Sequence, residues 1–207
     1  MSQADTGLRE RKKRQTRDTI VRVATELFLE RGFEATTIAD IAAAADIAPR
    51  TFFGYFASKE AVVFHDFEEV FATFAERLRG RPAGETAFDA MREWIVEHAA
   101  AVGLDTEAKR CWRRLIRETP ALQAHERSNL ARFEALLAEG VAADLGVPPD
   151  SLRAHLVSAA AVAALYALGS SDDASAARGT EHAVAVMDEA LVFLRGGLDA
   201  LRRHPPI

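Results

Sequence analysis

The sequence has few of the features that mark secreted, membrane-spanning or disulfide-stabilised proteins. Cys111 is the only cysteine among the 207 residues, so no internal disulfide framework can form, which is typical of a reducing cytoplasm. No apolar run reaches the length of a membrane span, and the charged opening MSQADTGLRERKKRQ has no apolar stretch of the kind that a signal peptide needs. We therefore expect a cytoplasmic protein with no membrane partner.

Signatures of catalysis and of metal binding are equally scarce. No glycine-rich phosphate loop and no nucleophile elbow accompanies Cys111, so nucleophilic catalysis is not indicated. The six histidines are scattered, and no two of them lie three or four residues apart, as metal ligands on one helix would. We expect neither an enzyme nor a protein that holds a metal ion or a cofactor.

No segment sustains the alternating pattern of a β-strand, whereas turn signals divide the chain into helix-length pieces. The first helix is predicted over 16–31, and its apolar residues recur at the spacing of one buried face: Ile20, Val23, Ala24, Leu27 and Phe28. Short helices beginning at Thr37 and Pro49 follow, and then longer ones over 58–79, 85–102, 106–118, 121–144, 150–168 and 177–203. We predict an all-α fold of about nine helices.

The first three predicted helices have the arrangement of a helix-turn-helix motif, in which a turn of a few residues joins the last two. Thr37 and Asp40 have the spacing of a capping box, and Pro49 suits the first position of a helix. Other small helical subdomains show a similar pattern of turn and capping residues. On periodicity alone, DNA binding and an ordinary helical subdomain therefore remain equal alternatives.

The net charge of −5 looks unfavourable for a DNA-binding protein, but the basic residues are unevenly placed. The segment from Arg9 to Arg17 carries six basic residues against Glu10 alone. Screening confines the field of a charge to roughly 8–10 Å, so the local balance decides contact with phosphates. In an arbitrary protein such a run is usually a solvated tail; beside a helix-turn-helix motif we expect a basic arm that contacts DNA.

The residues themselves are more specific than their spacing. TTIADIAAAADIAPRTFFGYFASKEAVV, from Thr36 to Val63, resembles the signature of TetR-family regulators, and ATELFLERGF before it, from Ala24 to Phe33, resembles the helix and turn that usually precede it. The resemblance implies a bacterial dimeric repressor that releases its operator when a small molecule binds the C-terminal domain. We accordingly divide the chain into a DNA-binding domain with its basic arm, 1–60, and a larger helical domain for ligand sensing and dimerisation, 61–207.

Phe52 and Phe56 lie four residues apart on the predicted recognition helix, so they should anchor it to the first two helices. Arg50 on the opposite side is the best candidate for reading a base, because a guanidinium can bond both O6 and N7 of guanine. Phe53 can either pack in the core or contact the groove. Tyr55 and Lys59 resemble the phosphate contacts of the family. Either Thr36 or Thr37, together with the free N–H groups at the start of the second helix, can hold another phosphate. The expected DNA-binding residues are Arg14, Thr36, Thr37, Pro49, Arg50, Thr51, Phe53, Tyr55 and Lys59.

Three positions depart from the common family pattern. Asp46 stands where glycine is usual in the turn, and aspartate tolerates a left-handed backbone better than most residues. Ala48 replaces a serine-like helix cap, at a cost of roughly 1 kcal/mol that Pro49 partly offsets. Gly54 inside the recognition helix costs roughly 1 kcal/mol relative to alanine, which predicts a helix that is flexible until DNA orders it.

The C-terminal domain is rich in aromatic residues at helical spacing. Core packing is the ordinary interpretation, but sensor domains of this family enclose a cavity between these helices, and aromatic walls suit an apolar ligand. His98 is either a satisfied core histidine or a polar contact for the ligand. The stretch from Trp112 to Asp150 also resembles an actinobacterial subgroup that includes regulators of the mycofactocin system, which favours a fatty-acyl or similarly elongated apolar inducer. The expected pocket residues are Phe67, Phe71, Met91, Trp94, Ile95, His98, Trp112, Phe133 and Leu137.

The last two predicted helices carry apolar stripes that can pack within one subunit or pair with a second copy. The resemblance implies a four-helix homodimer interface. Its expected residues are Leu152, Leu156, Ala160, Ala163, Val184, Met187, Leu191 and Leu194.

The leading hypothesis is therefore a repressor that binds a palindromic operator on double-stranded DNA and is released by an apolar small-molecule effector. The alternative is a helical DNA-binding or architectural protein that senses no ligand. Release of a selected operator by a small molecule separates the two.

Overall fold

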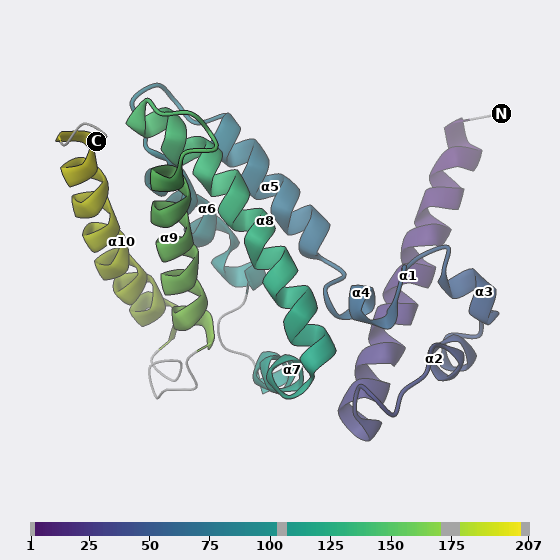
Figure 1. Cartoon of the computed structure of the whole chain (residues 1–207). Helices are drawn as coiled ribbons and strands as arrows, with labels where there is room; N and C mark the ends of the chain where they lie inside the picture. The colour runs from purple at the N-terminus through teal and green to yellow at the C-terminus, as the bar shows by residue number, and fades with distance from the viewer. Residues whose placement is uncertain (1–2, 103–106, 171–178, 204–207) are drawn as a thin grey trace. The chain divides into compact units, whose positions relative to one another are not determined.

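The computed structural model describes residues 3–102, 107–170 and 179–203, and every regular element in these ranges is a helix (Figure 1). The helices are α1 (Gln3–Arg31), α2 (Ile38–Ala44), α3 (Pro49–Phe52), α4 (Lys59–Val63), α5 (Phe67–Arg79), α6 (Ala87–Val102), α7 (Glu107–Glu118), α8 (Pro120–Leu145), α9 (Leu152–Ser170) and α10 (Gly179–Arg203). The prediction of an all-α fold is confirmed, with ten helices where about nine were expected. No helix in the described ranges is both long and apolar enough to cross a membrane.

The chain divides into two compact units. The N-terminal unit comprises Met1–Phe67 together with Arg114–His125, and the C-terminal unit comprises Glu68–Arg113 together with Glu126–Ile207. The sequence placed the division at 60/61 and assigned everything after it to one domain. The structure instead divides the chain after Phe67 and gives the N-terminal unit a second segment from the end of α7 and the start of α8.

In the N-terminal unit, α2 and α4 contact α1, and α3 contacts α2. The predicted apolar face of α1 is confirmed, because Ile20 and Ala24 are fully buried and Phe28 is nearly so. The helix begins at Gln3, so the segment predicted as an arm forms the first turns of α1. It ends before Gly32, whose φ of 85° is a left-handed conformation that glycine adopts without a steric penalty.

The single helix predicted over 58–79 is wrong, because the chain breaks between α4 and α5. Phe64 ends α4 with φ −104° and ψ 36°, outside the helical region. Two contacts hold the break: the Arg17 guanidinium donates to the carbonyl oxygen of His65, and the Phe64 ring stacks on His125 at 4.9 Å between centroids. Both contacts join the break to residues far away in the sequence, on α1 and at the start of α8.

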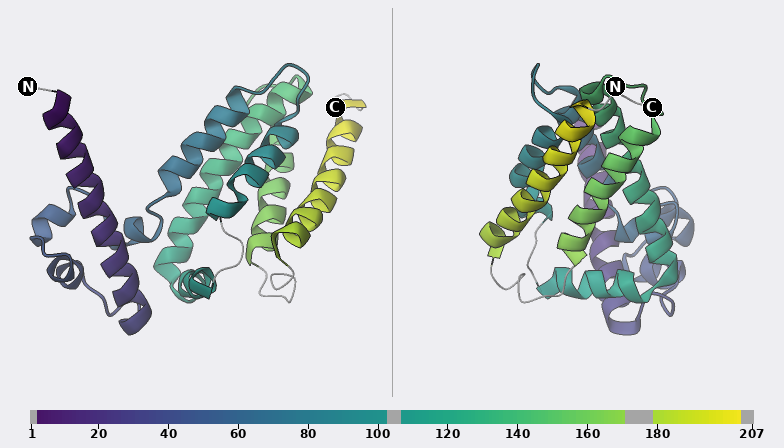
Figure 2. Two further views of the ribbon diagram at one scale, coloured as in Figure 1. Left: turned by 180° about the vertical axis from the view of Figure 1, so that it is seen from behind. Right: turned by 60° about the vertical axis from the view of Figure 1, so that its left-hand side comes forward.

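In the C-terminal unit, α5, α6, α8, α9 and α10 surround one apolar core, with α9 and α10 side by side (Figure 2). Gly140 on α8 allows a close approach, because a Cβ at this position would lie 3.0 Å from Ala87 Cβ and from Leu78 Cδ1. Near this point the Asp144 carboxylate accepts from the backbone N–H of Ala87 at 2.6 Å and from Arg81 at 3.2 Å. This pairing satisfies a free donor at the start of α6.

Candidate nucleic-acid interface, sensor core and subunit surface

α3 is the centre of the candidate DNA-binding surface. The prediction that Phe52 and Phe56 anchor it is confirmed, since their exposed fractions are 0% and 5%. The α-helix ends at Phe52, and the bonds from Gly54 N to Thr51 O and from Tyr55 N to Phe52 O follow the tighter i to i+3 pattern. The predicted recognition helix, which was expected to include Gly54 and Phe56, is therefore shorter than expected: it is one helical turn followed by turns. Gly54 lies after the helix, so the predicted helical cost at Gly54 does not apply.

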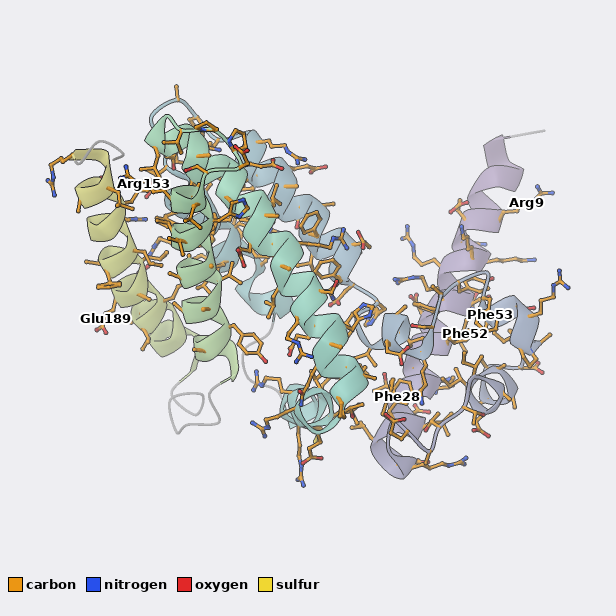
Figure 3. All side chains as sticks on the ribbon, viewed as in Figure 1. Arg9, Phe28, Phe52, Phe53, Arg153 and Glu189 are labelled. Carbon is orange, nitrogen blue, oxygen red and sulfur yellow. The ribbon has the colours of Figure 1, made fainter. Side chains whose placement is uncertain are left out.

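The side chains that α3 presents to solvent can be assigned from their burial. Pro49, Arg50 and Thr51 are exposed, and Tyr55 is half-buried. The open question about Phe53 is resolved in favour of the surface, because 58% of this residue is exposed beside the buried Phe52 ring (Figure 3). An exposed guanidinium, hydroxyl and ring on one turn are the residue types that contact base edges and phosphates.

The turn before α3 has the strained backbone that its sequence suggests. Asp46 has a φ of 54°, and in the described part of the chain it is the one residue other than glycine with a positive φ. The N–H of Asp46 donates to Ala43 O at 3.2 Å, and the N–H of Ile47 donates to Ala42 O at 3.0 Å, so carbonyls at the end of α2 are satisfied. Ala48 caps α3 without a side-chain bond, as expected for alanine.

Neither Thr36 nor Thr37 has a free hydroxyl donor for a phosphate. Thr36 is 1% exposed, and its hydroxyl donates to Gly32 O at 2.9 Å, so the expected contact at this residue is corrected. Thr37 and Asp40 form the predicted capping box: Asp40 N donates to Thr37 Oγ1, and the carboxylate accepts from the Thr37 hydroxyl and N–H. These bonds to Thr37 hold the pKa of Asp40 below its ordinary value.

Lys59 also requires a correction. Its Nζ donates to Phe33 O at 2.6 Å and to Thr36 O at 3.1 Å, and it lies 4.2 Å from the centre of the Phe33 ring. The ammonium group thus connects the start of α4 to the segment between α1 and α2 by hydrogen bonds. A group held in this way is a structural contact of the chain itself, and we do not include it among the proposed phosphate contacts.

The basic segment of α1 separates into two kinds of residue. Exposed cations occupy its first turns, and Arg9 projects from them in Figure 3. They are Arg9, Arg11, Lys12, Lys13 and Arg14. Arg17 differs, because it bonds the His65 carbonyl and lies 5.1 Å from the centre of the Phe56 ring. Arg17 is therefore removed from the expected DNA contacts, and Arg14 remains among them.

Five rings of the C-terminal unit form a cluster that we call the ring cluster: Phe71, Phe74, Trp94, His98 and Phe133. The centroid of Phe74 lies 5.1 Å from that of Trp94 and 5.7 Å from that of Phe133. Phe133 also lies 5.4 Å from Phe71, edge to face. His98 stacks on Trp94 at 5.0 Å, and its Nδ1 lies 2.9 Å from Trp94 O. That oxygen can only accept, so Nδ1 carries a proton.

The structure brings most of the expected pocket residues together. Met91 and Leu137 are buried in the core, and Ile95, Phe71 and Phe133 pack against it. Phe67 is the exception, because it is the last residue of the first segment of the N-terminal unit. Trp112 is half-buried on α7.

The expected dimer residues divide between an exposed face and a buried one. On α9 the expected face is free: Leu152 is 73% exposed, Leu156 is 61% exposed, and Ala160 and Ala163 are exposed. On α10 the expected residues are buried within their own subunit, at 3% for Met187, 1% for Leu191 and 8% for Leu194. These three are corrected to core residues. The side chain of Val184 lies outside the part of the chain that the structure describes.

Sequence reasoning missed the residues that α10 exposes. Val192 is 68% and Phe193 81% exposed, beside the buried Leu191 and Leu194. The signal was present, because apolar residues at adjacent positions cannot share one face of a helix. It does not reveal which of the two faces points outward.

Comparison with known families finds a match in each half of the chain. Residues 20–65 match the model of the bacterial regulatory proteins of the tetR family, and residues 85–199 match the model of the MftR C-terminal domain. The chain belongs to the TetR family. Its members are transcriptional regulators and not enzymes, and homodimers and ligand responsiveness are typical of them. The resemblance of the C-terminal half to the mycofactocin-system subgroup is confirmed as well.

Two relatives of this TetR-family chain show how similar it is to other members of the family. It is 39% identical over 150 residues to the HTH-type transcriptional regulator TcmR of Streptomyces glaucescens, a match that covers 70% of this chain and 66% of TcmR. It is 34% identical over 132 residues to MftR of Mycobacterium tuberculosis, which is named for the regulation of mycofactocin biosynthesis. This match covers 64% of this chain and 67% of MftR. The matched regions thus span about two thirds of both relatives.

A solved structure shows that the fold is that of TetR-family repressors. The FadR repressor of Thermus thermophilus, in complex with lauroyl-CoA, aligns with a TM-score of 0.57 over 86% of this chain and 93% of its own. Sequence identity is 23%, so the likeness concerns the fold.

Proposed function

We propose that the protein is a repressor that binds a palindromic operator as a homodimer and leaves it when an apolar small molecule binds the C-terminal unit. The observation that carries the proposal is the turn from Pro49 to Phe53, where exposed residues stand directly over the buried anchors Phe52 and Phe56. Because the anchors fix the turn to the N-terminal unit, its exposed side chains can meet DNA without prior rearrangement.

On this turn Arg50 is the residue that reads a base. It is exposed, and among the described residues it forms no ion pair, so its guanidinium is available to O6 and N7 of a guanine. Thr51, Pro49 and Phe53 lie within the same turn and add contacts to bases or sugar, and Tyr55 contacts a phosphate. Thr36, Thr37 and Lys59 are not part of this proposed surface.

The exposed cations at the start of α1, Arg14 among them, supply contacts to phosphates or to the minor groove. They are carried by a helix in the structure, so their spacing along the helix axis is set by 1.5 Å per residue. Such contacts are independent of sequence and weaken as salt rises. We place the protein in the cytoplasm, where its DNA partner lies.

A homodimer follows from the geometry of operator reading. Two recognition turns must lie about 34–36 Å apart, or a multiple of this distance, to enter successive major grooves on one side of the duplex. We assign the pairing surface to the exposed faces of α9 and α10, which carry Leu156 and Phe193. Large apolar residues exposed in a row are typical of an interface between subunits.

The ring cluster supports an apolar ligand. Aromatic walls with one or two polar atoms are typical of small-molecule sites, and His98 can supply a polar atom. A TetR-family repressor of the same fold has been solved with lauroyl-CoA, an elongated apolar acyl group on a polar carrier. Ligand binding acts on operator affinity only through a difference in affinity between the two protein states, and a few kcal/mol suffices.

The proposal is tested by selecting DNA from a random library with the purified full-length protein. We expect a palindrome with two half-sites, bound in a salt-dependent manner, and release of the selected fragment by lauroyl-CoA or by lauric acid. Recovery of no preferred sequence would overturn the proposal. A selected operator that neither compound displaces would favour the alternative, a DNA-binding protein without ligand sensing.

A further inference from the structure

Asn129 is a buried polar residue that the structure leaves without a partner. It is 8% exposed on α8, and among the described residues its Nδ2 has no hydrogen-bond acceptor. An unpaired donor in a protein interior is costly, so nearly all such groups meet a partner in native proteins. A partner from outside the chain must be an acceptor, because an amide nitrogen can only donate.

The position of Asn129 places it beside the ring cluster. Phe133 follows it by four residues on α8, so the two side chains lie on the same face, one helical turn apart. The next residues of this face, Leu137 and Val141, are both buried in the core of the C-terminal unit. Asn129 is thus a polar interruption in the apolar stripe that α8 turns to the interior.

Two neighbouring polar atoms of the ring cluster have partners within the chain. The indole Nε1 of Trp94 donates to Thr73 Oγ1 at 3.1 Å. The Nδ1 of His98 is bonded to Trp94 O. Asn129 differs from both, because its donor is buried and unused.

We propose that Asn129 is a ligand-binding residue that donates from Nδ2 to an oxygen acceptor, such as a carbonyl, on the effector. The inference rests on the proposed sensor function and narrows the effector to an apolar molecule that carries an oxygen acceptor. A pure hydrocarbon of the same shape leaves the amide donor unpaired and is disfavoured.

Benzophenone and diphenylmethane are suitable probes, because both carry two phenyl rings and they differ in a carbonyl against a methylene group. Equilibrium dialysis of the full-length protein gives a Kd for each, and the ratio of the two is compared between the wild type and Asn129→Leu. The difference in hydrophobicity between the probes is common to both proteins and cancels. We expect the preference for benzophenone to fall about ten-fold in the variant.

Asn129→Asp is a second variant of nearly the same size, and its carboxylate oxygens repel a carbonyl oxygen, so it should lose the preference as well. Ser158→Ala is the matched control. Ser158 is fully buried and its hydroxyl is also unpartnered, but it lies on α9, which contributes no ring to the cluster. This control should keep the wild-type ratio.

Thermal unfolding without any probe supplies a readout that does not depend on binding. Because leucine removes a buried unpaired donor, Asn129→Leu should have a Tm equal to or above that of the wild type. A lower Tm would show that Asn129 makes a structural bond, and the assignment would be overturned. An unchanged probe ratio in the Asn129 variants, or no binding of either probe to the wild type, would overturn it as well.

The outcome is distinguishable from failure of the repressor proposal. The probe ratio is measured without DNA, so a protein that selects no operator can still show the Asn129 effect. Conversely, if the wild type selects a palindrome and is displaced by lauroyl-CoA while Asn129→Leu leaves the probe ratio unchanged, the repressor proposal stands. In that case only the proposed role of Asn129 is overturned.

Discussion

Lys59 and Phe33 are joined twice, since the Lys59 Nζ donates to the Phe33 carbonyl at 2.6 Å and lies 4.2 Å from the centre of the Phe33 ring. A third contact, to Thr36 O at 3.1 Å, uses another of the three ammonium donors. These contacts connect the start of α4 to the chain between α1 and α2. They position the capping residue Thr37, at which α2 begins.

Lys59→Met should therefore lower the stability of the N-terminal unit. The variant keeps the length of the side chain but leaves two carbonyls without their charged donor, at a cost of about 1–3 kcal/mol. Urea unfolding followed by circular dichroism measures the loss. Lys13→Met is the matched control, because Lys13 is exposed on α1 and forms no ion pair with a described residue. If Lys59→Met were as stable as the wild type but bound every DNA sequence more weakly, Lys59 would be assigned to a phosphate contact instead.

The fold could be predicted where a residue's role depends on its near neighbours. The buried face of α1, the capping box of Thr37 with Asp40 and the anchors Phe52 and Phe56 all follow from spacings of three or four residues. Lys59 could not be assigned in this way. Its acceptors are backbone carbonyls 23 and 26 residues earlier. Every residue has a backbone carbonyl, so the sequence does not indicate which of them accept.

The candidate sites show the same limit. α10 is apolar on two faces, and only packing against α6 and α9 decides that Leu191 is buried and Phe193 exposed. At the break before α5, Arg17 donates to a carbonyl that is 48 residues away in the sequence. Asn129 looks like an ordinary surface residue until its burial is known.

Arg50→Ala should relax the sequence preference at one base position in each half-site of the operator. The expected loss at that position is about 1–3 kcal/mol, because a bidentate contact to guanine disappears. Binding to the selected operator and to its single-base variants, measured at one salt concentration, gives the effect. Arg22→Ala is the control: Arg22 is an exposed arginine of the same unit whose partner is Glu26 on α1. Equal discrimination by the Arg50 variant and the wild type would show that Arg50 reads no base.

Asp46→Gly should stabilise the protein, whereas Asp46→Ala should destabilise it. The φ of 54° crowds any Cβ against the backbone, and glycine has none. We expect a gain of about 0.5 kcal/mol for glycine, after its larger loss of chain entropy, and a cost of about 1 kcal/mol for alanine. Urea unfolding of the two variants side by side makes each the control of the other. If alanine were as stable as glycine, the turn would not be strained at this residue.

The ion pair between Arg92 on α6 and Asp188 on α10 should give the protein a measurable dependence on acid pH. Arg92 Nε and Nη2 contact the two carboxylate oxygens at 2.5 and 2.8 Å. The hydrogen bond from Arg92 is the main cause that lowers the pKa of Asp188, and the charges of Arg92 and Arg195 add to it. A group whose pKa is lowered on folding stabilises the fold above its unfolded pKa, about 3.9, and loses that contribution as the pH falls through the folded pKa.

Asp188→Asn should therefore reduce the free energy of unfolding near neutral pH and match the wild type in strong acid. The side chains are 37% and 36% exposed, so solvent screening limits the expected loss to about 0.5–1 kcal/mol. Urea unfolding at a series of pH values downward from 7 gives the difference. Glu189→Gln on the exposed side of α10 is the control and should not alter the curve. A difference that stays constant into strong acid would mean that the pair's charge does not stabilise the fold.

Phe193→Glu should convert the proposed dimer to a monomer without unfolding it. Phe193 is 81% exposed, so a charge at this position is solvated in a single subunit but buried and unpaired in the pair. Leu156→Glu on the exposed face of α9 should act in the same way. Leu191→Ala tests the buried face instead. It should cost about 2–5 kcal/mol of subunit stability, because it leaves a cavity in the core.

Sedimentation gives the mass of each variant, circular dichroism its helix content, and binding to the selected operator its affinity. Both glutamate variants should sediment as monomers of native helicity and bind a full palindrome no better than one half-site, because only a dimer gains from the second half-site. Persistent dimers of Phe193→Glu and Leu156→Glu would place the interface elsewhere. Dissociation by Leu191→Ala, with its stability intact, would return the interface to the face of α10 that the sequence first suggested.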